Sequence, residues 1–232
     1  MSSESDADWE LVLRAAAEFQ ALVPDAVLVG GTATAVYAKH RYSHDADHVL
    51  SDLEQRFSEL LAFLENSPDW KTNRLHPPKL ILGNFIGVET GLRQLIRSTP
   101  LETTTIDVGG ATVKVPTSLE MLRIKAWLIV SRNTVRDFID FVALTKTLGD
   151  NDTKQALMTF DDCYRDIYVD RSPGELSPLL QLARQLADPL PFDLSETEVP
   201  HYKGIVPPWD SWDNIRAECV RLATLVAQTV TD

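Results

Sequence analysis

Cysteine, positive charge and long apolar runs are all scarce in this sequence. Its 232 residues include two cysteines, Cys163 and Cys219, which lie far apart in the chain and therefore argue against a disulfide framework or a clustered zinc site. No run of about 18 apolar residues exists, so we expect no membrane-spanning helix. The start of the chain up to Asp8 is polar and acidic, unlike a signal peptide. These absences favour a cytoplasmic protein that does not associate with membranes.

Acidic residues outnumber basic ones, 34 against 22, for a formal net charge of −12. Binding along a nucleic acid requires clustered Lys and Arg that neutralise phosphates. The composition therefore argues against extended DNA binding, although it leaves room for a small basic pocket that takes one nucleotide or one RNA end. Apolar residues make up 44% of the chain, enough for a sizeable core in one large domain or two small ones.

Helical and strand patterns alternate in the first half of the chain. Apolar residues at three- and four-residue spacing predict helices over 8–22 and from Leu53 onward, and Ser51–Glu54 has the pattern of a capping box. Short runs rich in β-branched residues, bounded by glycine or proline, predict the strands. The expected strands are 26–29, 43–50, 79–82, 85–89, 103–108 and 111–115, the last two joined by a hairpin turn at Gly109-Gly110.

The pattern becomes helical after Pro116. Thr117 and Glu120 suggest a second capping box, and apart from a proline-rich loop over 188–209 the remainder reads as helix. We therefore predict an α+β fold with a mixed sheet and flanking helices over 1–116, followed by a helical domain over 117–232.

The chemistry concentrates in residues 27–49, VLVGGTATAVYAKHRYSHDADHV. A strand ends in Gly30-Gly31, followed by Thr32 at the expected start of a short helix. Glycines let a backbone approach a phosphate, and the first N–H groups of a helix can bind it. Asp45 and Asp47 then lie two residues apart on a strand and so share one face. Two such carboxylates suit a hard cation such as Mg²⁺, which also takes substrate phosphates as ligands.

The order of these elements resembles the first motif of the polymerase-beta-like nucleotidyltransferase superfamily. The stretch RIKAWLIVSRNTVRDFIDFVAL, residues 123–144, narrows the resemblance to the AbiEii/AbiGii toxin-like nucleotidyltransferases of type IV toxin–antitoxin systems. The likeness runs over roughly 26–148. It implies a metal-dependent enzyme with Asp45 and Asp47 on Mg²⁺, Mn²⁺ being the alternative ion, and with Gly30, Gly31 and Thr32 around the triphosphate.

The resemblance also implies a third carboxylate on a later strand. Glu89, in IGVETG, and Asp107, in TTTIDVGG, both qualify. We favour Glu89 as the group that takes the proton of the acceptor hydroxyl, because an aspartate before Gly-Gly is ordinary turn chemistry. Arg93 follows Glu89 on the same strand and is a candidate ligand of the triphosphate.

The helical motif adds candidates that rest on the resemblance. It makes Lys125 and Asp137 catalytic candidates and Arg136 a nucleotide-binding one, and it leaves Arg132 and Asp140 as weaker members. From the residues alone, Lys125 is equally a lysine at the edge of a core. Asp137 equally closes a helix that begins at Thr134.

Two residues beside the aspartates complete the set. Ser43 lies two residues before Asp45, at a position where toxin-like relatives carry a modifiable hydroxyl, and the resemblance places it with the nucleotide-binding residues. A phosphate there would add about −1.5 to −2 charge beside the metal ligands. His48 is either a ligand or a strand residue on the opposite face, and the second reading is favoured.

We therefore expect a Mg²⁺-dependent transfer of a nucleoside monophosphate from a triphosphate, bound between the two halves, to the 3′ end of a tRNA or to a protein hydroxyl. A cognate antitoxin is the expected partner. The alternatives are an enzyme of the same fold that transfers a phosphoryl group, an inactive interaction module, and a housekeeping nucleotidyltransferase with no toxin role.

Overall fold

The computed structural model describes residues 3–168, 176–195 and 197–229. The chain forms two compact units. The first consists of Met1–Val36 with Tyr42–Thr117, and the second of Tyr37–Arg41 with Ser118–Asp232. The later junction falls one residue beyond the boundary expected at 116. The segment Tyr37–Arg41 groups with the second unit because His40 and Arg41 bond to a helix of that unit.

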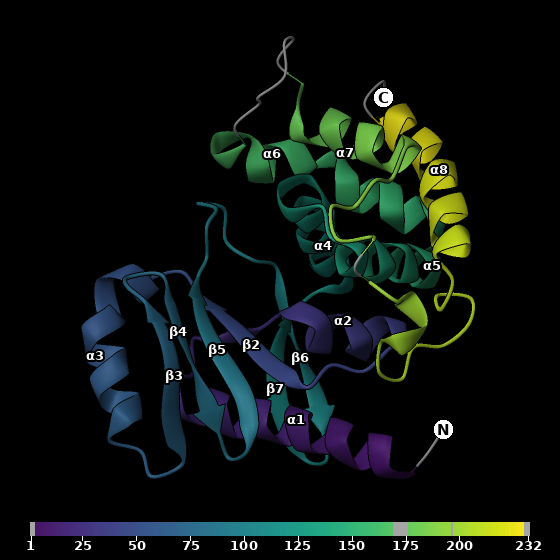
Figure 1. Cartoon of the computed structure of the whole chain (residues 1–232). Coiled ribbons are helices and arrows are strands. Elements are labelled where there is room, and N and C mark those ends of the chain that lie inside the picture. The colour runs from purple at the N-terminus through teal and green to yellow at the C-terminus, as the bar shows by residue number, and fades with distance from the viewer. Residues whose placement is uncertain (1–2, 169–175, 196, 230–232) are drawn as a thin grey trace. The chain divides into compact units, whose positions relative to one another are not determined.

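The first unit mixes helices and strands. Its elements are α1 (Ser3–Leu22), β1 (Val27–Leu28), α2 (Gly30–Ala38, whose last two residues belong to the second unit), β2 (Asp45–Leu50), α3 (Leu53–Glu65), β3 (Trp70–His76), β4 (Leu80–Phe85), β5 (Val88–Gln94), β6 (Thr103–Val108) and β7 (Ala111–Pro116). Five strands form one sheet in the order β1-β2-β5-β4-β3, of which Figure 1 labels β2, β5, β4 and β3. β2 is parallel to β5, whereas the other neighbours are antiparallel. The predicted α+β class with a mixed sheet is confirmed.

Helices α1 and α3 cover one face of this sheet. Phe19 of α1 and Phe57 of α3 belong to the same buried cluster as Leu50 of β2, Ile81 of β4 and Leu92 of β5. Every second residue of β2 contributes to this face, as its alternating burial shows. The opposite face of β2 carries the two aspartates, so the packing of the core determines which way they point.

Two local predictions in this unit are wrong. The strand expected over 85–89 is interrupted by a turn, because Ile86 and Gly87 have φ values of 44° and 89°; Glu89 consequently lies in the next strand, β5. The capping box at Ser51–Glu54 is absent as well. The N-cap of α3 is Asp52 without a side-chain cap, and the amide oxygen of Gln94 accepts the Glu54 N–H at 2.9 Å instead. The hairpin at Gly109-Gly110 is confirmed by the pairing of β6 with β7.

The second unit is helical, as predicted. Its elements beyond Tyr37–Arg41 are α4 (Ser118–Arg132), α5 (Val135–Met158), α6 (Phe160–Tyr164), a 3-10 turn (Arg165–Ile167), α7 (Pro178–Ala187), a second 3-10 turn (Val199–His201) and α8 (Trp212–Thr229). Helix α5 is kinked at Gly149, whose φ is 80°. The unit has its own buried core, which includes Phe138, Phe141, Leu182 and Leu222. None of the helices in the described ranges is both long and apolar enough to cross a membrane.

Candidate active site

The two aspartates of β2 occupy its less buried face. Asp45, Asp47 and Val49 are partly exposed, whereas Ala46, His48 and Leu50 between them are buried. This alternation is the two-residue period of a strand that is covered on one side only. Asp45 and Asp47 therefore point to the same side of the sheet, with alpha carbons about 7 Å apart by strand rise.

His48 lies on the face opposite the carboxylates. It is completely buried, and its ring centroid lies 4.9 Å from that of Phe19. Burial lowers the pKa of His48 to about 4, since an apolar environment disfavours the charged imidazolium. The structure thus places it in the core between the sheet and α1, on the wrong side of β2 to join Asp45 and Asp47.

Glu89 stands directly beside Asp45. In the parallel pairing of β2 with β5, Asp45 is in register with Glu89 and Asp47 with Gly91. Register partners on adjacent strands are about 4.8 Å apart and share a face, so three carboxylates gather on one side of the sheet. The other candidate, Asp107, lies in β6 of the separate hairpin, where its Oδ1 accepts the Gly110 N–H at 3.4 Å. This hydrogen bond is the turn interaction that the sequence suggested as the alternative role of Asp107.

Two glycines leave the space that the Asp47 carboxylate occupies. A Cβ added to Gly30 would lie 3.3 Å from Asp47 Oδ2, and one added to Gly91 would lie 2.9 Å from Oδ1. Gly30 also has a φ of 76°, a conformation that residues with a side chain rarely adopt. The sequence indicated the role of Gly30. Gly91 could not be recognised, because its contact depends on the pairing of β5 with β2.

Helix α2 begins at this glycine turn. Its first N–H groups belong to Gly30, Gly31 and Thr32, and such groups have no partner within a helix. The buried Thr32 hydroxyl donates to the Asp45 carbonyl oxygen at 2.6 Å. This bond fixes the start of β2 relative to α2. Because the hydroxyl is used in this way, the group of Thr32 that could bind an anion is its backbone N–H. Ser43 is buried, 8% exposed, and lies ahead of β2 rather than on it.

Arg93 supplies positive charge at the carboxylate face. It lies on β5 two residues beyond Gly91, and its Nε is 3.3 Å from Asp47 Oδ1. The side chain is 47% exposed, so the guanidinium can reach a bound anion as well as Asp47. Among the described residues, no group of three acidic, histidine or cysteine side chains is close enough to hold a metal ion by itself. A cation here would rely on one or two carboxylates and on oxygen atoms of a substrate, which is how Mg²⁺ is commonly bound.

The second unit contains a separate cluster of buried charges around Asp140. Its carboxylate is fully buried and accepts hydrogen bonds from Arg41 at 2.8 and 3.0 Å. It also lies 2.7 Å from His40 Nε2 and 2.7 Å from Lys125 Nζ. Burial by itself would raise the pKa of Asp140, but Arg41, Lys125 and His40 hold that pKa well below its usual range. Sequence reasoning did not identify His40 and Arg41 as members of this cluster, because no local pattern links them to Asp140.

Lys125 is 1% exposed. Burial lowers the pKa of its ammonium, while Asp140 and Asp137 act in the opposite direction. Of the two readings open from the sequence, the geometry favours the packed lysine, because its charge is already matched by Asp140.

Asp137 is also fully buried and fully bonded. Its carboxylate accepts from Arg132 at 2.6 and 3.2 Å and from the Thr134 hydroxyl at 2.6 Å. Thr134 is the N-cap residue of α5 but makes no side-chain cap; instead Asp193, from the proline-rich loop, accepts the Val135 N–H at 2.8 Å. The hydrogen bonds of Asp137 thus stabilise the N-terminal turn of α5, but they do not form a capping box.

Arg136 differs from these matched groups. It is partly buried, and within the described ranges no hydrogen bond or ion pair is found for its guanidinium. The charge of Arg136 acts on the Tyr202 hydroxyl. The pKa of Tyr202 is raised, chiefly by burial and also by Asp193, while Arg136 and Arg41 act to lower it. Arg136 is therefore a cation of the second unit that remains available to an anion.

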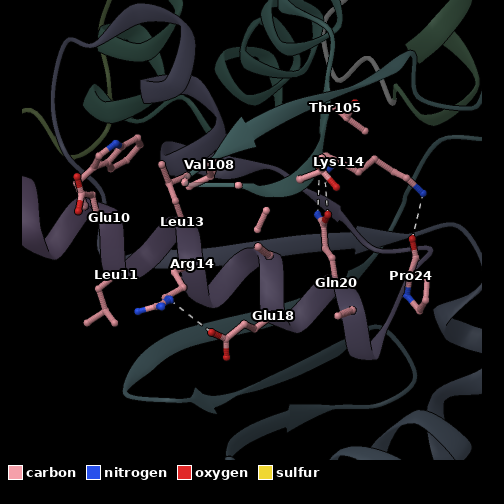
Figure 2. A pocket seen from close by; sticks show the side chains of 17 residues that line it. Glu10, Leu11, Leu13, Arg14, Glu18, Gln20, Pro24, Thr105, Val108 and Lys114 are labelled. Carbon is pink, nitrogen blue, oxygen red and sulfur yellow. Dashed lines mark hydrogen bonds and ion pairs between the residues drawn. The ribbon is translucent and has the colours of Figure 1, made fainter.

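A groove of about 1470 Å³ lies elsewhere in the first unit, between α1 and the β6–β7 hairpin (Figure 2). The Gln20 side-chain amide donates to and accepts from the Lys114 backbone at 2.9 and 2.7 Å along its wall. None of the candidate site residues lines this groove. Its size therefore does not bear on the carboxylate face, where the charged groups converge.

Comparison with known proteins identifies the family of the chain. A family model described as "Nucleotidyl transferase AbiEii toxin, Type IV TA system" matches residues 11–218, which takes in both units. The chain belongs to this family of nucleotidyltransferases.

Curated relatives match a shorter stretch. The chain is 32% identical over 133 residues to the "Mycolic acid-containing lipids exporter MmpL11" of Mycolicibacterium smegmatis and 32% over 136 residues to the "Heme uptake protein MmpL11" of Mycobacterium tuberculosis. Each match covers 57% of this chain and 13% of the relative. The chain thus spans about an eighth of those proteins, and the transport activities in their names are those of the relatives.

Two solved structures are similar at low identity. An antigenic nucleotidyltransferase-like protein from Paracoccidioides brasiliensis is 16% identical with a TM-score of 0.46, covering 72% of this chain and 92% of its own. The Megavirus polyadenylate synthase is 12% identical with a TM-score of 0.38, covering 84% of this chain and 39% of its own.

Proposed function

We propose that this protein is a type IV toxin-class enzyme that transfers a nucleoside monophosphate from a nucleoside triphosphate to a hydroxyl group. The observation that carries the proposal is the register of β2 and β5, which sets Glu89 beside Asp45 and on the same face as Asp47. Membership of the AbiEii family supports it. The glycine turn at the start of α2 lies next to this face, because a Cβ added to Gly30 would lie 3.3 Å from Asp47 Oδ2.

Each residue of this face has a part in the proposed reaction. Asp45 and Asp47 would hold Mg²⁺, or Mn²⁺, and the ion would offset the negative charge of the phosphates. The first N–H groups of α2 and the guanidinium of Arg93 would bind phosphate oxygens. Glu89 would accept the proton of the acceptor hydroxyl. The hydroxyl oxygen would bond to the alpha phosphorus as the bond between that phosphorus and the departing pyrophosphate breaks.

The donor atoms of the face fit such a cation. Carboxylate oxygens are the hard ligands that Mg²⁺ prefers, and one or two of them suffice when phosphates complete the shell. The space kept by Gly30 and Gly91 around the Asp47 carboxylate would be filled by any larger residue. We assign Lys125 and Asp137 to supporting the second unit, and Arg136 to contact with an anionic group of a substrate.

The acceptor class follows from charge. A net charge of −12 disfavours a long RNA groove and suits a small contact such as the 3′ end of a tRNA, or a hydroxyl of a protein. A cognate antitoxin is the partner that membership of a type IV toxin family implies.

Labelled nucleotides test the proposal directly. The protein is incubated with each triphosphate, labelled at the alpha or the gamma phosphate, together with Mg²⁺ and bulk tRNA or protein. We expect label transfer from the alpha position alone, lost on chelation and in Asp45→Asn. Transfer of the gamma label would instead identify a phosphotransferase, and absence of any Mg²⁺-dependent nucleotide binding would identify an inactive module.

A further inference from the structure

The pairing of the strands brings basic side chains of β3 onto the face of the sheet that carries the three carboxylates. The rank of paired residues that begins with Asp47 and Gly91 continues through Leu82 of β4 to Arg74 of β3 (Figure 1). Paired residues on neighbouring strands share a face. A Cβ added to Gly91 would lie 2.9 Å from Asp47 Oδ1 and 2.7 Å from Leu82 Cδ2, so this rank stays on one side of the sheet.

The two neighbouring ranks also end in basic residues of β3. The rank of Glu89 ends at Lys71, and that of Arg93 ends at His76. Lys71 and Arg74 are three residues apart, a spacing that in a regular strand would put them on opposite faces. The register shift of β3 between these two residues restores them to the same face. Lys71, Arg74 and His76 thus form a basic row along the edge of the carboxylate face.

The basic row is exposed and has no acidic neighbours in the sequence. Its three side chains lie at the surface, and within the described parts of the chain no ion pair or side-chain hydrogen bond is found for them. Residues 70–88 contain no aspartate or glutamate, although acidic residues outnumber basic ones in the whole chain. The positive charge of Lys71 and Arg74 is therefore available to an anion.

An uncharged strip separates the basic row from the carboxylates. It consists of the half-buried side chains of Leu80 and Leu82 on β4 and of Gly91 on β5. Apolar surface suits the sugars and bases of a nucleic acid, whereas its phosphates require cations. From β3 to β5 the face is two strand spacings wide, about 10 Å. That width is the length of about three nucleotides of a stacked strand.

We propose that the face of β3 and β4 binds a short single-stranded segment of a nucleic acid, with its phosphates on Lys71 and Arg74. A polynucleotide matches both features of this face, because it has repeated anions for the basic row and a terminal hydroxyl for the carboxylates. The role of that hydroxyl rests on the proposed function, and the inference selects a polynucleotide as the acceptor in place of a protein. Two or three phosphate contacts also agree with a net charge of −12, which disfavours a long groove.

Arg14 provides a matched control for Arg74. It is an exposed arginine of the same unit, 76% exposed, and it lines the groove between α1 and the β6–β7 hairpin. Arg74→Gln, Lys71→Gln and Arg14→Gln each remove one positive charge, and thermal unfolding checks that each variant folds. The probe is a fluorescent single-stranded RNA of about eight nucleotides, a usual site size for single-strand binding. Its binding is measured by anisotropy over a range of salt without triphosphate, and its kcat and KM as acceptor by alpha-label transfer.

We expect the logarithm of the binding constant to fall with the logarithm of salt concentration with a slope of about −1.4 to −2, because each phosphate contact contributes about 0.7. Arg74→Gln and Lys71→Gln should each reduce this slope by about 0.7 and weaken binding about tenfold. Both should raise the KM for the RNA by a similar factor, with little change in kcat or in the KM for the triphosphate. Arg14→Gln should behave like the unaltered protein.

Three results would contradict parts of this reasoning. Equal losses in Arg14→Gln and Arg74→Gln, or unaltered RNA binding in both Arg74→Gln and Lys71→Gln, would overturn the binding surface. Transfer of label to a protein, with the RNA left unmodified, would overturn the choice of acceptor. If the unaltered protein transfers no label to any acceptor, the proposed function fails, and the anisotropy series by itself still decides whether this face binds a nucleic acid.

Discussion

Gly91 and Gly87 offer a direct test of whether the position of Asp47 matters to the chemistry. Both lie within or just before β5, and each is replaced by alanine. A Cβ at Gly91 would lie 2.9 Å from Asp47 Oδ1 and 2.7 Å from Leu82 Cδ2. A Cβ at Gly87 meets nothing within 4 Å, although the backbone there has a φ of 89°. One substitution therefore pushes on the carboxylate, and the other strains only the backbone.

The sizes of the two effects follow from these contacts. An ordinary contact of a Cβ begins at 3.4 Å, so in Gly91→Ala the Asp47 carboxylate must retreat by about 0.5 Å. If 1 Å costs about 10²-fold in rate, half of that costs about tenfold. Gly87→Ala should instead lose roughly 1–2 kcal/mol because of its left-handed backbone, which lowers the melting temperature by about 2–8 °C for a chain of this size.

Alpha-label transfer per folded molecule, with thermal unfolding alongside, separates these outcomes. Gly91→Ala should be slow and Gly87→Ala should be unstable but active. The Leu82 contact also costs stability in Gly91→Ala, by about 1–3 kcal/mol for overpacking, and the double variant with Leu82→Ala should restore stability without restoring the rate. A Gly91→Ala protein with an unaltered rate would refute the view that Asp47 must hold its present position.

Three further outcomes are expected. Glu89→Gln should lower the transfer rate by at least about 10²-fold, as expected on losing a general base, while Asp107→Asn should change only hairpin stability; the reverse result in a rate assay would move the third carboxylate to the hairpin. Asp137→Asn should destabilise the protein by about 1–3 kcal/mol by weakening a buried bonding group, and Thr134→Ala by less, with transfer per folded molecule retained in both; loss of transfer in Asp137→Asn alone would restore its catalytic assignment. The pKa of Asp140 is held below its unfolded value, so its contribution to stability is present above about pH 4 and is lost as the pH falls further; acid unfolding curves in which Asp140→Asn keeps the same pH dependence would contradict this.

The carboxylate strand was predictable because its signals are local. Gly30-Gly31, Asp45 and Asp47 lie within twenty residues of one another, and the two-residue period of a strand suffices to put both aspartates on one face. The same period, with the apolar residues between them, predicted that His48 points into the core. Glu89 could be proposed as the third carboxylate, but its position beside Asp45 could not be predicted. The sequence does not show which strands are neighbours in the sheet.

The second unit shows where such reasoning stops. Lys125, Asp137 and Asp140 were found as charged positions in a helical pattern, and the pattern carried no information on their partners. Two partners of Asp140, Arg41 and His40, lie 99 and 100 residues away. Asp193, which accepts the Val135 N–H at the start of α5, lies 58 residues from Val135. These contacts depend on the tertiary fold, which overrides the local capping signal at Thr134.

Buried acidic residues of the second unit are paired with arginines, whereas the acidic residues of the β2–β5 face are clustered together. This contrast distinguishes residues that stabilise the fold from candidates for catalysis. In the second unit Asp140, Asp137 and Glu120 are buried, and each is matched by at least one arginine at hydrogen-bond distance. A buried charge that loses its partner is strongly destabilising, so such pairs are what a stable core requires. On the β2–β5 face, Asp45, Asp47 and Glu89 stand together with Arg93 close to one of them. Carboxylates gathered in this way repel one another, and folding gains nothing from placing them there. The arrangement would become favourable with the proposed divalent cation and phosphates bound. We therefore propose the reaction for this face and not for the better-bonded cluster around Asp140.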